Sequence, residues 1–245
     1  MTFSSRYPFN LNPRTGIQIP RDLEPYQGDW RAEISSGADR TTIFRWPPPQ
    51  TTKSYVKLQA ATPAMTAMTA CLRAKTAFIG NDETFLLSYA ATSTDNSFLF
   101  GYTRSGVISS LVSNSKKVTP VFGMIYDGAW HHWCFSWNSR GGKWTVYKDG
   151  MPAAAGTGFQ TGNIIPADGV WIIGQDQDTV GGGFDATQAY VGDVTSINVW
   201  NTDNVDVAAV ANCGDNFGGN VISWYDVSKE IHEVSSYRED LCHLK

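Results

Sequence analysis

Short runs of β-branched and aromatic residues, separated by turn signals, constrain the fold of this sequence more than any other feature. The dipeptides Asp127-Gly128, Asp149-Gly150 and Asp168-Gly169 favour positive φ angles and therefore predict hairpin turns. Hardly any segment has helical periodicity. The pattern predicts an all-β fold in which two antiparallel sheets pack as a sandwich. The clearest predicted strands are residues 54–59, 85–89, 98–102, 130–137, 144–148, 170–173 and 194–200.

One short helix is expected outside the strands. Asp203 or Asn204 is a suitable N-cap for a helical turn through residues 205–209, because either side chain can accept a hydrogen bond from a free backbone N–H group. Gly214 follows, as is common just past the end of a helix.

The first 40 residues differ from the rest, because they hold four prolines and no sustained period of a helix or a strand. We predict an irregular N-terminal arm at 1–40 and a domain at 41–245. The formal net charge of -4 argues against a nucleic-acid partner, since no basic stripe is present to bind phosphates. No run approaches the roughly 18 apolar residues of a membrane-spanning helix, so no membrane span is expected.

The four cysteines are widely spaced, and none belongs to a Cys-x-x-Cys motif, which disfavours zinc-ribbon and thioredoxin-like sites. They are Cys71, Cys134, Cys213 and Cys242. An even number suits two disulfides in an oxidising compartment, so we expect a secreted or extracellular protein, with the pairing left open. The opening residues contain no apolar leader, so either a leader was removed or the sequence is a piece of a longer chain.

Oxygen-bearing side chains are concentrated directly after the predicted strand at 170–173. They are Asp176, Gln177, Asp178, Asp185 and Gln188, and three glycines at 181–183 lie between them. Crowded carboxylates repel one another unless a cation lies between them, and Ca²⁺ accepts roughly six to eight such oxygens in loose geometry. The glycines would let the loop fold back on itself. A solvated acidic turn is the alternative. An EF-hand is excluded, because Thr187 occupies the twelfth position, which requires Glu.

The segment from His132 to Ser139, His-Trp-Cys-Phe-Ser-Trp-Asn-Ser, carries a specific family resemblance. It is similar at every fixed position to the pentraxin signature His-x-Cys-x-Ser/Thr-Trp-x-Ser/Thr. Further similar segments occur in the same order at 88–90, 95–96, 147–150, 174–178, 181–188, 191–193 and 198–200. The resemblance covers roughly residues 41–245 and implies a jelly-roll β-sandwich of the concanavalin and laminin-G type.

The resemblance also implies two calcium ions in each protomer. The first would be held by Asp95, Asn96, Asp176, the backbone carbonyl of Gln177, and Asp178. The second would share Asp176 and Asp178 and add Asp185 and Gln188. Many pentraxins have Glu where this chain has Asp176, so the carboxylate shared by the two ions is one methylene shorter. We expect a small geometric adjustment and a weaker second site.

As a pentraxin-like protein, the chain is expected to bind phosphocholine-like, phosphoethanolamine-like or glycan ligands through calcium. Relatives that prefer phosphocholine have an aromatic residue where this chain has Gly101, so Phe100 and Tyr102 beside it become candidate ligand contacts. The resemblance further implies a Cys71–Cys134 disulfide. It implies a second one, Cys213–Cys242, similar to a bridge of the longer neuronal members.

Two functions are consistent with this resemblance. The first is a secreted pattern-recognition lectin of innate immunity, assembled as a homo-oligomeric ring, commonly a pentamer, that strengthens weak sites by multivalency. The alternative is a structural or adhesive module within a larger extracellular assembly, with the arm at 1–40 docking it to a partner. The oligomeric state distinguishes the two functions.

Enzymatic and zinc-binding alternatives find little support. No Gly-x-Ser-x-Gly elbow occurs, and every Glu lies outside the predicted strands, so no catalytic residue is predicted and no enzyme is expected. His132 shares a strand face with Cys134, but a His-x-Cys zinc site would need free thiols and further ligands. We expect a core histidine beside a disulfide instead. The nine tryptophans are likewise expected in the core rather than as a sugar platform.

Overall fold

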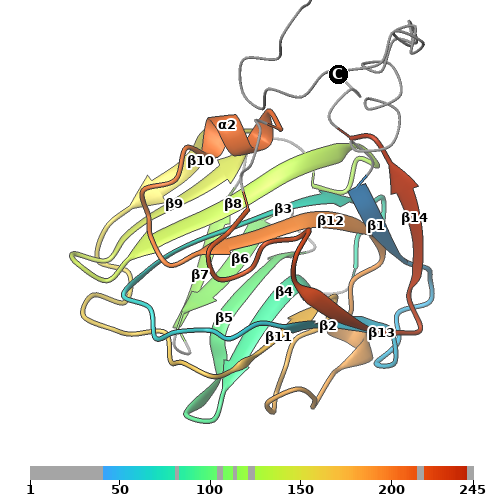
Figure 1. Cartoon of the computed structure of the whole chain (residues 1–245), viewed down its shortest axis with the longest axis horizontal. Helices are drawn as coiled ribbons and strands as arrows, with labels where there is room; N and C mark the ends of the chain where they lie inside the picture. The colour runs from blue at the N-terminus through green and yellow to red at the C-terminus, as the bar shows by residue number, and fades with distance from the viewer. Residues whose placement is uncertain are drawn as a thin grey trace, which may run out of the picture. The chain divides into compact units, whose positions relative to one another are not determined.

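The computed structural model describes residues 41–80, 83–103, 107–112, 115–120, 125–213 and 218–241 (Figure 1). These residues form two seven-stranded antiparallel sheets with one short α-helix, which confirms the predicted all-β sandwich. The predicted arm at 1–40 lies outside the described residues. Among the described helices, none has the length and apolar composition needed to cross a membrane.

The first sheet, here called sheet A, has the strand order β10-β9-β8-β3-β12-β1-β14. Its strands are β10 (Met151–Gly156), β9 (Lys143–Lys148), β8 (Trp130–Asn138), β3 (Ala67–Lys75), β12 (Gly192–Trp200), β1 (Thr41–Trp46) and β14 (Ser235–Glu239). The second, sheet B, has the order β13-β2-β11-β4-β5-β6-β7. Its strands are β13 (Ser228–His232), β2 (Tyr55–Gln59), β11 (Val170–Ile173), β4 (Glu83–Ala91), β5 (Thr94–Thr103), β6 (Val107–Val112) and β7 (Ser115–Pro120).

Alternating residues of both sheets point inward and form one aromatic-rich core. Its largest fully buried side chains include Trp46, Trp137 and Trp171, which come from three strands of the two sheets. Phe98 packs against both Phe135 and Trp171, with ring centroids 5.8 and 6.1 Å apart. Seven tryptophans are buried, at 46, 133, 137, 144, 171, 200 and 224. Tryptophan therefore serves mainly the core, as predicted.

All seven strands predicted from the sequence are present, but only one of the three predicted hairpin turns is a hairpin. Asp149 and Gly150 both have positive φ, at 50° and 81°, and join β9 to β10. Asp127-Gly128 precedes β8, and Asp168-Gly169 precedes β11, at the end of long connections. In each of these pairs only one residue has positive φ, so neither forms the two-residue turn that was predicted.

The predicted helix exists, although its predicted N-cap is wrong. Helix α2 spans Val207–Ala211, and Asp206 is its N-cap, with the Asp206 carboxylate accepting a hydrogen bond from the backbone N of Ala209 at 3.0 Å. Asp203 instead accepts a hydrogen bond from Asn138 Nδ2 at 2.9 Å, so its carboxylate fastens the preceding turn to β8. Gly214 lies outside the described residues.

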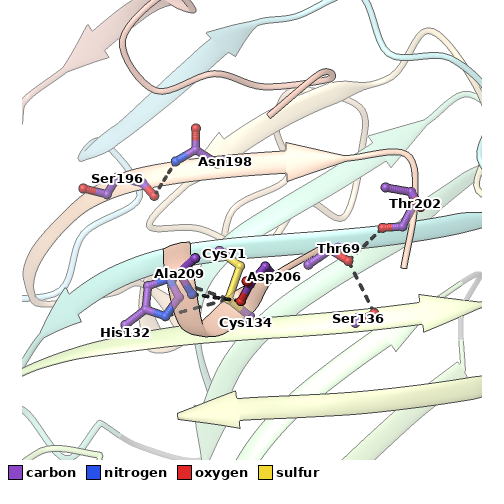
Figure 2. The surroundings of a disulfide bond; sticks show 10 residues. All are labelled: Thr69, Cys71, His132, Cys134, Ser136, Ser196, Asn198, Thr202, Asp206 and Ala209. Atoms are coloured by element: carbon purple, nitrogen blue, oxygen red, sulfur yellow. Dashed lines mark hydrogen bonds between the residues drawn. A yellow bond between two sulfur atoms is a disulfide. The ribbon is translucent and has the colours of Figure 1, made fainter. Parts of the chain in front are cut away.

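The outer face of sheet A is closed by a disulfide beneath α2 (Figure 2). Cys71 of β3 lies directly opposite Cys134 of β8, and their bond confirms the expected pairing. Trp200 and Val207 pack against the two half-cystines. Nearby, the Thr69 hydroxyl of β3 donates to the carbonyl of Thr202 at 2.7 Å, which fastens the segment leading to α2 to this strand (Figure 2). The same hydroxyl lies 3.3 Å from that of Ser136 in β8.

His132 occupies the core position expected beside this disulfide. The side chain is buried, and its Nε2 lies 3.6 Å from Cys134 Sγ. Burial and, to a lesser extent, the charge of Arg73 lower the pKa of His132 to about 3, so the imidazole is neutral. Because the two sulfurs bond to each other, neither is a zinc ligand. Cys213 is also disulfide-bonded, while Cys242 lies outside the described residues.

Candidate functional site

The acidic segment predicted to bind calcium begins where β11 leaves sheet B. Gly174 adopts φ 86°, and a Cβ at this position would lie 2.4 Å from Nε1 of Trp46, so only glycine fits the turn. The side chain of Gln175 is fully buried, and its Nε2 donates to the carbonyls of Thr51 and Ser54 at 2.7 and 2.9 Å. These contacts fix the direction in which the chain enters the acidic segment.

Gln177 anchors the segment on the outer face of sheet B. Its Nε2 donates to Ser88 Oγ and to the carbonyl of Val170, both at 3.0 Å, while its Oε1 accepts from the backbone N of Gly181 at 2.8 Å. Both polar atoms of the side-chain amide therefore have partners inside the protein. Only the backbone carbonyl of Gln177 is left as a candidate ligand, which is the atom that the family resemblance implied.

The glycines fold the segment back, as the sequence predicted. Thr179 and Gly182 exchange two backbone hydrogen bonds, at 3.2 and 2.9 Å. Gly183 has φ 73°, and a Cβ there would lie 2.9 Å from the backbone N of Thr179 and 3.0 Å from Cβ of Asp178. A side chain at residue 183 would therefore push the second half of the loop away from Asp178.

Asp176 is the electrostatic centre of the candidate site. This residue is only 6% exposed, and its pKa is raised to about 6. Burial is the main cause, and the carboxylates of Asp178 and Asp95 contribute, against the hydrogen bond that the backbone N of Gln177 donates at 2.8 Å. The fold therefore brings these three carboxylates, two from the loop after β11 and one from β5, into electrostatic contact.

Asn96 supplies a further oxygen without a partner. The Asn96 Oδ1 atom is buried, and no hydrogen bond within the described residues satisfies it. The backbone N of Asn96 donates to Asp95 Oδ1 at 2.9 Å, so the two side chains are held next to each other at the start of β5. A buried amide oxygen normally has a hydrogen-bond donor or a cation as its partner.

These residues fit a hard divalent cation. Carboxylates, an amide oxygen and a backbone carbonyl are the donors that Ca²⁺ prefers, and positive charge would relieve both the repulsion at Asp176 and the unsatisfied Asn96. The carboxylates do not form a closed cage here. In the described part of the chain, only Cys71, His132 and Cys134 bring three potential His, Cys, Asp or Glu ligand atoms within 4.8 Å of one another. An ion would therefore have to draw the carboxylates together.

Asp185 and Gln188, predicted for a second ion, lie at the two ends of a short 3-10 helix, η1 (Ala186–Gln188), of which Gln188 is the last residue. Asp185 is its N-cap, and the hydrogen bond from the backbone N of Thr187, at 2.8 Å, lowers the pKa of this exposed carboxyl. Gln50 Nε2 donates to the carbonyls on either side of Gln188, which holds this turn in place. The contribution of these two residues to metal binding stays a prediction.

Phe100 and Tyr102 do not belong to the candidate site. Their side chains are 1% and 0% exposed, and the Tyr102 hydroxyl donates to the carbonyl of Phe78 at 3.0 Å. Alternation along β5 turns both rings into the core, so neither can contact a ligand on the surface. Gly101 faces outward, where a Cβ would lie 2.2 Å from the carbonyl of Thr84. The prediction that these two rings contact a ligand is therefore wrong.

One group of residues near the loop is not indicated by the sequence pattern. Tyr55, Phe184 and His232 bring their rings together beside the acidic segment. His232 ends β13, a strand that the sequence pattern did not indicate, because Lys, Glu and His at 229–232 lack the enrichment typical of strands. Only the pairing of β13 with β2 would have revealed the contact.

Comparison with known proteins agrees with this structure. The model of the pentaxin family, also written pentraxin, matches residues 42–237. Mouse neuronal pentraxin-2 is 35% identical over 189 residues, which cover 75% of this chain and 43% of that protein. This chain thus spans less than half the length of curated relatives such as mouse and human neuronal pentraxin-2.

Two solved structures have the same type of fold. The crystal structure of a heptameric SAP-like pentraxin from Limulus polyphemus superposes with a TM-score of 0.75 at 28% identity, covering 84% of this chain and 98% of that one. Domains LG4-5 of the mouse laminin α1 chain, at 13% identity and a TM-score of 0.53, share the fold alone; the match covers 81% of this chain and 47% of theirs. The predicted jelly-roll sandwich is thereby confirmed. The chain belongs to the pentaxin family.

Proposed function

We propose that this chain is a calcium-dependent binding module, a secreted pattern-recognition lectin without catalytic activity. The residues proposed to hold the first of two calcium ions are Asp95, Asn96, Asp176, Gln177 through its carbonyl, and Asp178. The second ion would share Asp176 and Asp178 and add Asp185 and Gln188. Calcium, when bound, offers open coordination positions to anionic or hydroxyl oxygens of a ligand.

The observation that carries this proposal is the environment of Asp176. A carboxylate that is 6% exposed and repelled by two neighbouring carboxylates destabilises the fold unless a cation compensates for it. The anchored side chain of Gln177 and the folded-back glycine loop hold this arrangement in place. The unpartnered Asn96 Oδ1 at the same place has the same explanation. A solvated acidic turn explains neither feature.

The proposed ligands carry phosphoethanolamine-like or phosphocholine-like groups, or are glycans. Individual contacts of this kind are weak, so we propose a homo-oligomeric ring in which several sites act together. The heptameric assembly of the Limulus relative supports a ring but does not fix the number of subunits here. The disulfides agree with an extracellular location.

Retention on immobilised phosphoethanolamine, with millimolar Ca²⁺ or with excess chelator, tests the proposal. Wild-type protein should be retained only with Ca²⁺, and Asp178→Asn should lose this retention. Asp168→Asn is a matched control, because Asp168 is an exposed carboxylate at positive φ, where Asn is equally well accommodated. Retention that persists in chelator, or an Asp178→Asn variant that binds Ca²⁺ as the wild type does, would reject the proposed mechanism.

A second candidate is a structural or adhesive module of a larger extracellular assembly. It is supported by the greater length of the relatives, since the match covers 43% of mouse neuronal pentraxin-2. Light scattering distinguishes the two functions: a closed ring keeps its mass on dilution, whereas a detached module runs as a monomer. Turnover of a polysaccharide by the Asp176→Asn variant would instead indicate an enzyme.

A further inference from the structure

Three rings from separate segments meet on the outer face of sheet B. Tyr55, at the start of β2, lies directly opposite His232, at the end of β13, and their rings stack with centroids 4.1 Å apart and planes inclined by 14°. Phe184 packs on Tyr55 at a tilt of 58°, with centroids 4.9 Å apart. Tyr55 therefore contacts both other rings. We call these three residues the ring cluster.

The ring cluster adjoins the acidic loop. Phe184 is bonded on one side to Gly183, where an added Cβ would lie 3.0 Å from Cβ of Asp178, and on the other side to Asp185. Consecutive Cα atoms are about 3.8 Å apart, so Phe184 cannot lie far from either carboxylate. Val56, next to Tyr55, pairs with Ile173 at the end of β11, which places Tyr55 beside the start of the same loop.

The ring cluster is partly open to solvent and has polar edges. All three residues are half-buried, and the His232 side chain is 35% exposed. His232 Nε2 lies 2.9 Å from a carboxylate oxygen of Glu230, which is itself about half exposed and accepts a hydrogen bond from Gln59 at 3.4 Å. The Tyr55 hydroxyl has no hydrogen-bond partner among the described residues. Rings that serve only the core would be covered, as Trp171 and Phe98 are.

We propose that Tyr55, Phe184 and His232 form a subsite that receives the apolar face of a neutral pyranose ring. The hydroxyls of the same sugar would be bound at the acidic loop, so the inference rests on the proposed function and names its ligand class. Aromatic faces bury the C–H surface of a sugar, while a few polar groups at their edges fix its orientation.

The charges around the ring cluster favour an uncharged ligand over an ionic one. Lys57 and Glu230 face each other across β2 and β13, so the adjoining surface carries both signs. A headgroup of one charge sign placed over the rings would meet a like charge on one side and an opposite charge on the other, so the pair gives it no net attraction. Hydroxyls can both donate to Glu230 and accept from Lys57, so a hydroxyl-bearing ring satisfies both neighbours.

The test measures two kinds of retention in parallel, on beads bearing neutral pyranoses (glucose, galactose, mannose and N-acetylglucosamine) and on beads bearing phosphoethanolamine. The variants are Phe184→Ala and His232→Ala, and Tyr225→Ala is the control, because Tyr225 is 74% exposed and lies outside the ring cluster. Each variant should bind the retained pyranose roughly fivefold or more weakly, in line with the contribution of an aromatic contact. Calorimetric Ca²⁺ affinity and phosphoethanolamine retention should stay unchanged in both variants.

Three outcomes would overturn the subsite: no pyranose retains the wild type, both variants bind pyranoses as the wild type does, or both variants lose Ca²⁺ affinity together with pyranose binding. The last outcome would show that the rings only support the loop. Failure of the proposed function is distinct, since it removes calcium-dependent retention on phosphoethanolamine beads in the wild type itself. Pyranose retention that persists in chelator but is lost in the variants would keep the rings as a sugar contact and reject the calcium mechanism.

Discussion

The two outer faces of the sandwich have opposite effects on the stability of the fold. On sheet A, a disulfide, α2 and the side chains of Trp200 and Val207 form a closed apolar cluster. On sheet B, the loop after β11 buries Asp176 among like charges and leaves Asn96 Oδ1 unsatisfied. The sheet A face raises the free energy of unfolding, whereas the acidic loop on sheet B lowers it when no cation is bound. A domain can keep such an unfavourable binding loop only because stabilising contacts are concentrated elsewhere.

This comparison predicts that the two faces respond differently to mutation. Changes on the sheet A face should alter the free energy of unfolding and leave Ca²⁺ affinity intact. Changes at the acidic loop should weaken Ca²⁺ affinity without lowering the free energy of unfolding, and some should stabilise the calcium-free protein.

The double variant Cys71→Ala and Cys134→Ala should show the largest effect. The bond closes a loop of 63 residues, and releasing it adds conformational entropy to the unfolded chain worth about 4 kcal/mol. Denaturant unfolding in chelator should show this loss. Calcium titration of the folded fraction should give the wild-type affinity, because no residue of the acidic loop contacts the disulfide. A variant that unfolds like the wild type would show that the sheet A face does not depend on this bond.

Asp176→Asn should stabilise the calcium-free protein. The pKa of Asp176 is about 6 in the folded state against 3.8 when unfolded, so its favourable contribution is complete below pH 4 and is lost as the pH rises through 6. The difference corresponds to at most about 3 kcal/mol at pH 7 or above, and a neutral Asn avoids it. In chelator, the variant should therefore unfold at higher denaturant than the wild type at pH 8, and at the same denaturant concentration near pH 4.

The same variant should lose its stability advantage over the wild type when Ca²⁺ is present. Wild-type protein should gain stability on addition of millimolar Ca²⁺, whereas Asp176→Asn should gain little, because the shared ligand has lost its charge. Asp168→Asn should follow the wild type under both conditions. If Asp176→Asn is destabilised in chelator, the carboxylate forms a favourable interaction in the fold, and the contrast between the two faces fails.

The sequence predicted strands well where aromatic and β-branched residues are dense. Residues 170–173 and 130–137, with their aromatic and β-branched residues, correspond closely to β11 and β8. It missed the buried central strand β3, whose sequence Ala-Met-Thr-Ala-Cys-Leu-Arg-Ala-Lys has few such residues. Edge strands such as β13 and β10 were missed, because half-exposed strands such as Ser228–His232 carry charged and polar residues. Their β structure depends on pairing with a neighbour rather than on local preference.

The candidate site was predictable in its composition but not in its geometry. Clustered oxygen ligands and the family resemblance indicated Asp95 and Asp176, which the fold does bring together. By contrast, Phe100 and Tyr102 were chosen for their positions beside Gly101, although the alternation of Phe98, Phe100 and Tyr102 already places all three on one buried face. The contact of Tyr55 with His232 depends on the register of two strands that lie far apart in the sequence.

A smaller effect should separate the observed helix cap from the predicted one. Asp206→Ala removes the hydrogen bond to the backbone N of Ala209 and should cost about 1 kcal/mol of unfolding free energy. Asn204→Ala, at an exposed position that was a predicted cap, should change the unfolding free energy by no more than a few tenths of a kcal/mol. Calcium affinity should stay at the wild-type value in both variants. Equal losses in the two variants would contradict Asp206 as the N-cap.

The smallest predicted effect is the pH dependence of stability that arises from His131. His131 Nδ1 lies 2.8 Å from Asp149 Oδ2, and its Nε2 lies 3.0 Å from Asp127 Oδ2. The hydrogen bond with Asp149, followed by that with Asp127, raises the pKa of His131 against the effects of burial and of Lys148. Only the doubly protonated ring can donate to both carboxylates, so deprotonation removes one of the two bonds.

The resulting stabilisation should be complete below the unfolded pKa of His, about 6.5, and should fade as the pH rises through the higher folded value. The ring is partly exposed to solvent, which limits the effect to under about 1 kcal/mol. We therefore expect His131→Gln to be less stable than wild type at pH 5.5, with the difference shrinking towards pH 8.5. Saturating Ca²⁺ separates this titration from that of Asp176, because a calcium-bound carboxylate stays ionised across this range. A pH-independent difference would mean that His131 acts through packing rather than through its two carboxylates.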